Sequence, residues 1–410
     1  MIVTARRGVM SSAIRRTDSP RWAGAIAGMA GAVVAAARIV VAGHRNIASF
    51  IVVGSDHVRG RIPTGVPITS GQGYDGQFYY RMALAPLNFD RTAHGIRMDT
   101  LSRFERVGYP AFAWLVAAGR SSLVPWSLVI VNVLGLACLG ALGAMIARGA
   151  RHHAWWGLVL PGYFGFVWVL SRDLAEIVTA TFVVAGVVAL RRDRFVLAGA
   201  AFSVAVLSRE TGLLVIALLA LERPLAATRR RVVDRRARAV APGASTVDAT
   251  GTTPHISWIL PGAVFTAWQL VARLATGSWP LLTSGQKNLD VPFAGFVQGF
   301  RHYLSLLPSR AALLWFGELF VLVVVVVAAA LALRTTTARL YERAAWVAYA
   351  VVAATLAPGI WLGDVGFRSL DDLYVFSCII LLSSPRRLTV PAVLVAGSWT
   401  VVAVELIRFI

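Results

Sequence analysis

Residues 124–147 read "VPWSLVIVNVLGLACLGALGAMIA", and no charged side chain interrupts them. The hydrocarbon core of a bilayer is about 30 Å thick, and a helix crosses it with about 20 predominantly apolar residues. Apolar runs of that length recur along the 410-residue chain, which is 57% hydrophobic and 15% charged. They do not alternate as the strands of a membrane barrel do. The sequence therefore predicts an all-α, polytopic helical membrane protein with about ten or eleven transmembrane helices.

The run ends at "RGARHH" (148–153), and basic residues dominate many of the links between apolar runs in the same way. The chain carries a net charge of +20. Lys and Arg gather in the cytoplasmic loops of membrane proteins, so this charge indicates topology, and we expect no nucleic-acid partner. The two cysteines, Cys138 and Cys378, lie inside apolar runs and predict no disulfide.

The alternation of runs and links predicts the organisation of the chain. A basic cytoplasmic N-terminus (1–22) leads into a first transmembrane helix (23–43), which is longer than the apolar core of a secretory signal and so is expected to stay uncleaved. The remaining segments follow in order: an extracytoplasmic loop with interfacial helices (44–123), transmembrane helices (124–221), a cytoplasmic basic and partly disordered loop (222–257), and C-terminal transmembrane helices (258–410) with extracytoplasmic loops at 276–310 and 361–372.

The stretch 195–221 allows two interpretations. It is either one long helix interrupted by "SRETG" or two short helices that meet at Arg209 and Glu210. A single helix would place the arginine-rich loop 222–257 outside the cell. The positive-inside rule favours the hairpin, because the hairpin keeps this loop in the cytoplasm.

The long first loop contains "GQGYDGQFYYRMAL" (71–84), which sets Asp75 among four aromatic residues. Two structural readings are open. Asp75 is a good N-cap for a helix that starts at Gly76. The aromatic side chains fit an interfacial belt. A connecting loop needs neither the acid nor the aromatics, so the stretch is also a candidate site.

The predicted topology brings the unusual charges of the chain to the extracytoplasmic face, where charges at the ends of spans usually face a cavity or each other. Carboxylates and arginines together suit a site for an anionic headgroup. Structural readings stand beside this one: Asp173 and Glu176 fit the start of a helix, and Arg209 and Glu210 fit an ion pair that holds helices together. The chain has no nucleotide-binding motif and no D-x-D.

Two motifs carry a resemblance to a known family. "YDGQFYY" (74–80) and an R-x-x-R-x-x-Y-P box (Arg103, Arg106, Tyr109, Pro110) are both complete here, and "LSRETGLL" (207–214) follows. They resemble a family of bacterial polytopic proteins associated with cell-surface glycopolymer formation. The resemblance covers the chain from the first helix to about Leu214, and the remainder only in hydropathy.

That family in turn resembles the GT-C glycosyltransferases, which transfer a sugar from a polyprenyl phosphate at the outer side of the membrane. The resemblance implies a GT-C-like fold in a bacterial cytoplasmic membrane with the active site facing outside. It implies a polyprenyl-phosphate sugar donor and a cell-envelope glycan or glycoprotein acceptor. Because the chain lacks D-x-D, we expect no divalent metal, and the lipid-linked sugar is a substrate rather than a cofactor.

The resemblance also assigns roles to residues. Asp75 stands at the place of the acidic catalytic base of the first outer loop. The candidate ligands of the donor phosphate are Arg209, Arg368, Arg103 and Arg106. The candidate residues for the acceptor or the sugar are Tyr74, Gln77, Tyr79, Tyr80, Arg81, Asp173, Glu176 and Glu210.

Two other functions remain open from sequence. A transporter or flippase for lipid-linked glycans would also have many spans and outer-face arginines, although such proteins often show internal repeats, and none is visible here. A non-catalytic scaffold of an envelope-polymer complex is the other. The sequence leaves the identity of the sugar, the acceptor and the linkage open.

The topology can be tested by cysteine labelling. We predict that cysteines placed beside Asp75, Asp173, Arg209 and Arg368 react with a membrane-impermeant thiol reagent added to intact cells or spheroplasts. Labelling beside Arg209 only after permeabilisation would contradict the hairpin and place that segment in the cytoplasm.

Overall fold

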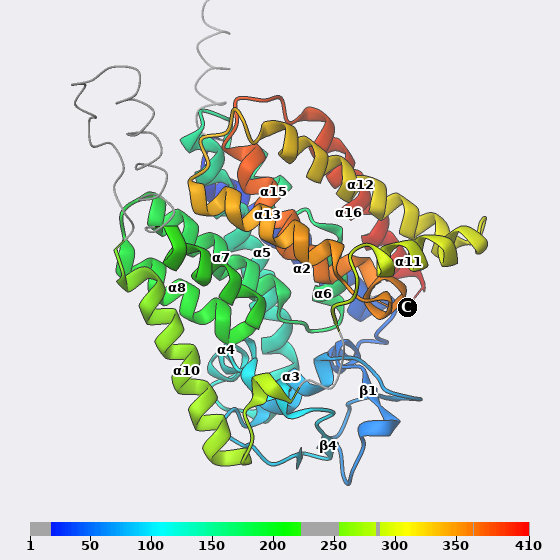
Figure 1. Cartoon of the computed structure of the whole chain (residues 1–410). Helices are drawn as coiled ribbons and strands as arrows, with labels where there is room; N and C mark the ends of the chain where they lie inside the picture. The colour runs from blue at the N-terminus through cyan, green and yellow to red at the C-terminus, as the bar shows by residue number, and fades with distance from the viewer. Residues whose placement is uncertain (1–17, 223–253, 284–287, 364, 410) are drawn as a thin grey trace, which may run out of the picture.

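The computed structural model describes residues 18–222, 254–283, 288–363 and 365–409. Most of the predicted N-terminal segment (1–22) and of the basic loop (222–257) therefore lies outside the described residues. The described chain is mostly helical, which confirms the all-α class (Figure 1). Its strands are two short pairs: β1 (Val53–Gly54) runs parallel to β2 (Ile68–Thr69), and β3 (Thr92–Ala93) runs antiparallel to β4 (Ile96–Arg97).

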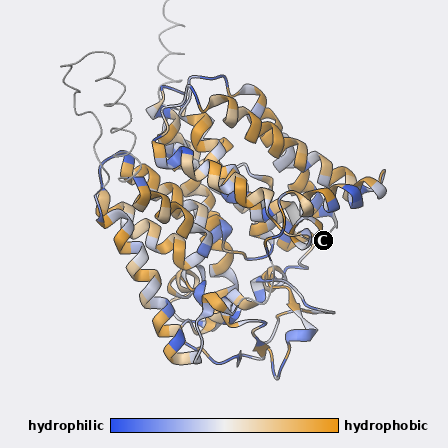
Figure 2. Cartoon of the chain, in the orientation of Figure 1, coloured by the Kyte–Doolittle hydropathy of each residue, from blue (hydrophilic) through white to orange (hydrophobic). Residues whose placement is uncertain are grey.

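Five helices of the described residues are long and apolar enough to cross a membrane. They are α2 (Pro20–Val41), α5 (Val124–Gly149), α10 (Ile256–Thr276), α12 (Arg310–Ala332) and α16 (Thr389–Phe409). Hydrophobic residues predominate along the helices (Figure 2). These five agree within a few residues with runs that the sequence predicted as spans, because uninterrupted apolar composition is a local property of the sequence.

The other predicted spans form shorter helices, so ten or eleven full-length spans are not found in the described part of the chain. The shorter helices are α3 (Gly76–Leu84), α4 (Gly108–Val116), α6 (Phe164–Ser171), α7 (Glu176–Arg191), α8 (Phe195–Ser208), α11 (Ala294–Ser305), α13 (Leu340–Ala354), α14 (Pro358–Gly363) and α15 (Asp371–Leu382). Single 3-10 turns complete the set: η1 (Ile47–Phe50), η2 (Ser55–His57), η3 (Leu101–Glu105), η4 (Ser121–Leu123), η5 (Ala154–Val159), η6 (Glu210–Gly212), η7 (Pro280–Leu282) and η8 (Val365–Leu370).

Prolines explain two of the interruptions. The apolar run 154–170, within the predicted transmembrane segment 124–221, is split into η5 and α6 around Pro161. The apolar run 344–360, within the predicted segment 258–410, is split into α13 and α14 before Pro358. Proline lacks the N–H for an internal helical hydrogen bond and disfavours helical geometry in the residue before it. The short helices α6, α7 and α15 are almost entirely buried and form the core of the bundle.

The stretch 195–221 is also interrupted. Helix α8 ends at Ser208, Arg209 is extended (φ −153°, ψ 138°), and helical structure resumes at 213–222. A Cβ on Gly212 would lie 3.4 Å from Val206, so the chain turns back against α8 there. The stretch therefore consists of two short helices and not of one continuous helix.

Basic links between apolar runs meet at one end of the bundle, which we call the basic pole (residues 148–153, 191–194, 334–339 and 383–387). Arg191 reaches both Glu342 (2.5 Å) and Ser383 (2.9 Å), and His152 Nε2 lies 2.5 Å from the Ser384 carbonyl. The segment that carries α3, β1 and β4 lies at the other end of the helices (Figure 1). Basic links that are far apart in the sequence thus come together in space.

Helices α2 and α5 pack through small residues. A Cβ on Gly24 would lie 2.8 Å from the Ala137 carbonyl oxygen, and one on Gly140 would lie 2.7 Å from that of Ala23. Gly24 and Gly28 form a G-x-x-x-G pair, the arrangement that lets membrane helices approach closely. This contact anchors the first long helix to the centre of the bundle.

We predict that Gly24→Leu destabilises the protein by about 1–3 kcal/mol, the usual effect of overpacking a close contact. The measurement is the thermal unfolding midpoint in detergent. Ala25→Leu, on the exposed face of the same helix, is the matched control and should leave the midpoint nearly unchanged. Equal midpoints for both variants would show that α2 and α5 do not depend on this contact.

Candidate functional site

Charged side chains from distant parts of the chain meet at the end opposite the basic pole. We call this group the Asp75 cluster. It consists of Asp75, Asp99, Arg103, Glu176, Arg209, Arg368 and Asp371, which are joined by ion pairs of 2.8 to 3.7 Å.

Asp75 lies at the solvent-accessible edge of the cluster and joins two of its arginines. Its Oδ1 accepts a hydrogen bond from Arg103 at 2.9 Å, and its Oδ2 accepts one from Arg368 at 3.0 Å. Helix α3 does begin at Gly76, but the Asp75 side chain makes no capping hydrogen bond. The capping interpretation therefore fails, because both carboxylate oxygens are used by arginines.

A buried layer lies beneath this edge. Arg209 is 3.1 Å from Asp371 and 3.7 Å from Glu176, and Arg368 reaches the same Glu176 carboxylate at 3.6 Å. The side chains of Glu176 and Asp371 are 5% and 1% exposed, whereas those of Asp75 and Arg368 are 21% and 20% exposed. A ligand would therefore meet Asp75 and Arg368 before it could reach Arg209.

The R-x-x-R-x-x-Y-P box has a structural explanation. Arg103 binds Asp75, Arg106 holds Glu210 through two hydrogen bonds (2.9 and 2.6 Å), and the Tyr109 hydroxyl accepts from Asn132 of α5. The spacing thus lets one segment connect α3, the turn after α8, and α5. Arg209 and Glu210, adjacent in sequence, contact different partners.

The turn before α7 packs directly against the YDGQFYY box. A Cβ on Gly76 would lie 2.1 Å from the Arg172 carbonyl oxygen, so this position requires glycine. The guanidinium carbon of Arg172 lies 5.6 Å from the centroid of the Tyr74 ring, and that of Arg368 lies 4.9 Å from the same centroid. The ion pairs of the described residues give Arg172 no carboxylate partner. Sequence reasoning did not select Arg172 as a ligand, and its place beside Tyr74 makes it a candidate.

Asp173 is fully buried, and neither of its carboxylate oxygens has a hydrogen-bond partner in the described residues. Burial raises the pKa of Asp173 well above its usual range, and Arg38 offsets only part of that effect. Asp173 also adopts a positive φ of 52°, a strained conformation for a residue other than glycine. The turn between α6 and α7 therefore holds a buried acid with no hydrogen-bond partner among the described residues.

Four residues predicted to bind the sugar or acceptor are buried or are bonded within their own segment. Gln77 bonds the Gly54 amide and the Gln72 carbonyl, and Arg81 bonds Asn88 and the Asp90 carbonyl. Tyr79 and Tyr80 are each 2% exposed. Gln77 and Arg81 thus hold the segment 44–123 together. Two aromatics of the box reach the cluster: Arg368 lies 4.9 Å from the centroid of the Tyr74 ring, and Arg103 lies 4.8 Å from that of the Phe78 ring.

The arginines set the protonation of the carboxylates. Burial acts to raise the pKa of Asp75, but Arg368 and Arg103 outweigh it and hold that pKa well below its usual range. Burial also acts to raise the pKa of Glu210, but the charge and hydrogen bonds of Arg106 outweigh it and lower that pKa to about 2. Both groups are carboxylates at neutral pH.

Glu105 behaves differently and was missed by sequence reasoning. It is 3% exposed, and its carboxylate accepts from Gln269 of α10 at 3.3 Å. Burial, helped by the neighbouring Glu210 charge, raises the pKa of Glu105 to about 7, although Arg106 and Arg103 oppose this. The position of Glu105 between Arg103 and Arg106 of the R-x-x-R-x-x-Y-P box was the sequence signal that could have identified it. In the described residues no three His, Cys, Asp or Glu side chains form a metal-binding group.

No family model matches the chain, and no curated protein and no solved structure matches it. The resemblance to surface-glycopolymer proteins therefore rests on the motif residues themselves.

We predict a pH-dependent stability effect of Glu105. Its folded pKa lies above the ordinary value of 4.5, so its stabilising contribution is present below pH 4.5 and is lost as the pH rises through 7. Glu105→Gln should therefore gain about 1–3 kcal/mol of stability relative to wild type between pH 4.5 and 7.5. Thermal unfolding across this range measures the difference.

Asp56→Asn, at an exposed position of the same segment, is the control and should follow the wild-type pH profile. A constant difference between Glu105→Gln and wild type across the range would show that Glu105 does not titrate there.

Proposed function

We propose that the protein is a membrane glycosyltransferase that moves a sugar from a polyprenyl-phosphate donor to a hydroxyl of a cell-envelope glycan or glycoconjugate. One observation carries the proposal: a partly exposed carboxylate, Asp75, is bound by two arginines, Arg103 and Arg368, beside an aromatic ring, Tyr74. In this proposal the base (Asp75), the ligands of the phosphate (Arg103 and Arg368) and a ring on which a sugar can stack (Tyr74) lie next to one another.

The proposed reaction is a displacement at the anomeric carbon of the donor sugar. The acceptor oxygen forms a bond to that carbon, and the bond from the carbon to the phosphate oxygen breaks. The acceptor proton passes to the Asp75 carboxylate, a general-base step. The polyprenyl phosphate leaves with the electron pair, and arginines at its oxygens stabilise the charge that develops there.

The arginine pairing suggests how the base becomes competent. With Arg103 and Arg368 both bound, Asp75 is a weak base because its pKa is held low. A donor phosphate that attracts these arginines would weaken their hold on Asp75 and raise its pKa. Arginine suits this exchange, since its planar fork binds carboxylate and phosphate in the same geometry.

Arg368 is the preferred phosphate ligand in this proposal, with Arg172 beside it. Both guanidinium groups lie over Tyr74. Arg209 is buried against Asp371 and Glu176, so we assign it to holding the lower layer in place. The apolar helices around the cluster fit a substrate that stays in the bilayer by its lipid tail.

A transporter for lipid-linked glycans remains the second candidate because α8 is interrupted at Arg209, next to buried charges. Broken helices of this kind form substrate sites in many transporters. Purified protein incubated with a panel of polyprenyl-phosphate sugars and acceptor glycans separates the two. Mass spectrometry should detect sugar transfer or donor hydrolysis for the enzyme, and neither for a transporter.

We predict that Asp75→Asn lowers sugar transfer by about 10²–10⁴-fold, the usual contribution of a general base. Expression should remain near normal, because asparagine keeps the size of the side chain. Asp75→Glu should recover part of the activity, since its carboxylate is displaced by one methylene. The measurement is the initial rate with a radiolabelled donor.

Asp56→Asn is the matched control, an exposed aspartate of the same outer segment, and should transfer at the wild-type rate. Wild-type transfer by Asp75→Asn would remove Asp75 as the base. The base would then be sought among Glu105, Asp173, Glu176 and Glu210.

A further inference from the structure

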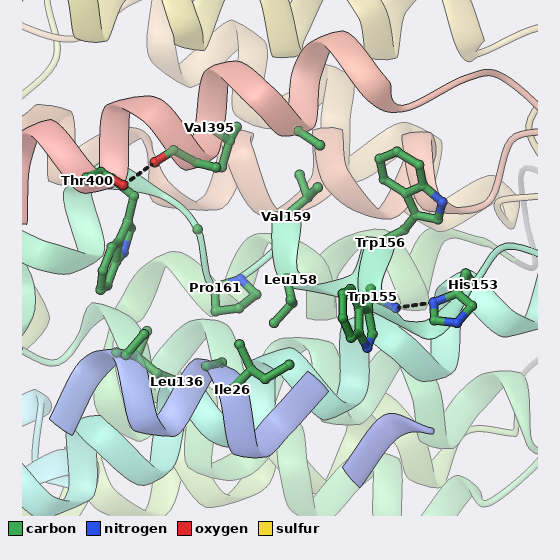
Figure 3. Close-up of a pocket in the computed structure, with 16 residues that line it drawn as sticks. Ile26, Leu136, His153, Trp155, Trp156, Leu158, Val159, Pro161, Val395 and Thr400 are labelled. Carbon is green, nitrogen blue, oxygen red and sulfur yellow. Dashed lines mark hydrogen bonds between the residues drawn. The ribbon is translucent and has the colours of Figure 1, made fainter. Parts of the chain in front are cut away.

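An apolar cavity of about 610 Å³ lies between α2, α5, η5 and α16. Figure 3 shows α16 on one side and α2 on the other, with the chain from His153 to Pro161 between them. His153 and Trp155 lie at one end, and Thr400 lies at the other. The cavity is therefore elongated along two of the helices that are long enough to span a membrane.

The walls of this groove are almost entirely hydrophobic. Ile26 of α2, Leu136 of α5 and Val395 of α16 contribute to them, together with glycine and alanine positions that leave room between the helices. Ile26 is 40% exposed and Trp155 is 50% exposed. An opening of this kind between spanning helices faces the bilayer, and a hydrocarbon chain is the occupant that such a surface favours.

The end of the groove at His153 belongs to the basic pole. His153 lies two residues after Arg151, and the ring of His152 lies 2.5 Å from the carbonyl oxygen of Ser384, two residues before Arg386. Arg151, Arg386 and Arg387 are all exposed. The mouth of the groove thus carries positive charge, and Trp155 lies there as tryptophan does at a headgroup boundary.

We propose that this groove binds an anionic phospholipid, with one acyl chain between α2 and α16 and the headgroup phosphate against the arginines of the basic pole. Basic surfaces beside grooves between membrane helices recognise anionic headgroups in this way. The lipid would fill the space between α2 and α16 beside η5. It would thus connect the first and the last of the long helices. The site is separate from the Asp75 cluster, because no residue of that cluster lines the groove.

The test uses the full chain in nanodiscs of equal parts phosphatidylglycerol and phosphatidylcholine, followed by native mass spectrometry. One phosphatidylglycerol should remain bound to the protein after release from the disc. Ala396→Phe, which places a ring in the groove, should lower that occupancy by at least about tenfold. Val393→Phe is the matched control, because Val393 is exposed on α16 but does not line the groove.

The headgroup is tested separately. Arg386→Gln with Arg387→Gln should lower retention of phosphatidylglycerol several-fold, whereas Arg59→Gln with Arg61→Gln, the same charge change on the first outer segment, should not. Equal retention of phosphatidylcholine, full retention by Ala396→Phe, or replacement of the bound lipid by added polyprenyl phosphate would each overturn the proposal. Asp75→Asn should retain the lipid, so the outcome is independent of the proposed glycosyltransferase activity.

Discussion

The carboxylate of Asp75 is shared between Arg103 and Arg368, and Arg368 lies 293 positions further along the chain. This pairing joins the segment 44–123 to the turn before α15, and the contact of Arg368 with Glu176 extends it to α7. Charged groups at a membrane boundary are stable when they meet partners, because unpaired burial is expensive. The fold at this end is therefore organised around satisfying these charges, and the helices deliver them to one place.

The same requirement separates the cluster into an accessible edge and a buried layer. At the edge, Asp75 and Arg368 can exchange one partner for another with little rearrangement, since both are partly exposed. Below it, Arg209 and Asp371 are held by helices on several sides. Such a layer positions the edge, and an edge of arginines bound to one carboxylate is suited to receive a competing anion.

Much of the local structure follows from sequence. The bounds of α5, α10, α12 and α16 lie close to the predicted runs, because apolar length is sufficient to mark them. The start of α3 at Gly76 was predicted too, but the role of Asp75 there was not. Helix capping is a local preference of about 1 kcal/mol, and two charge-assisted bonds to distant arginines outweigh it.

Part of the candidate site could likewise be predicted from sequence, and part could not. Topology predicted that Asp75, Arg103 and Arg209 belong to one face, and the structure places them in or beside one cluster. The roles of Arg172 and Glu105 depend on what surrounds them: a carbonyl packed on Gly76 in one case, and Gln269 of α10 in the other. Neither neighbour is near in sequence.

The sequence by itself determined the all-α class and the long apolar helices, since both depend on the composition of single segments. The tertiary structure alone decided which charges are paired, which are buried, and which remain at an edge where a ligand can reach them. Pairing and burial depend on distances between segments that are far apart along the chain, and those distances exist only when the helices are packed.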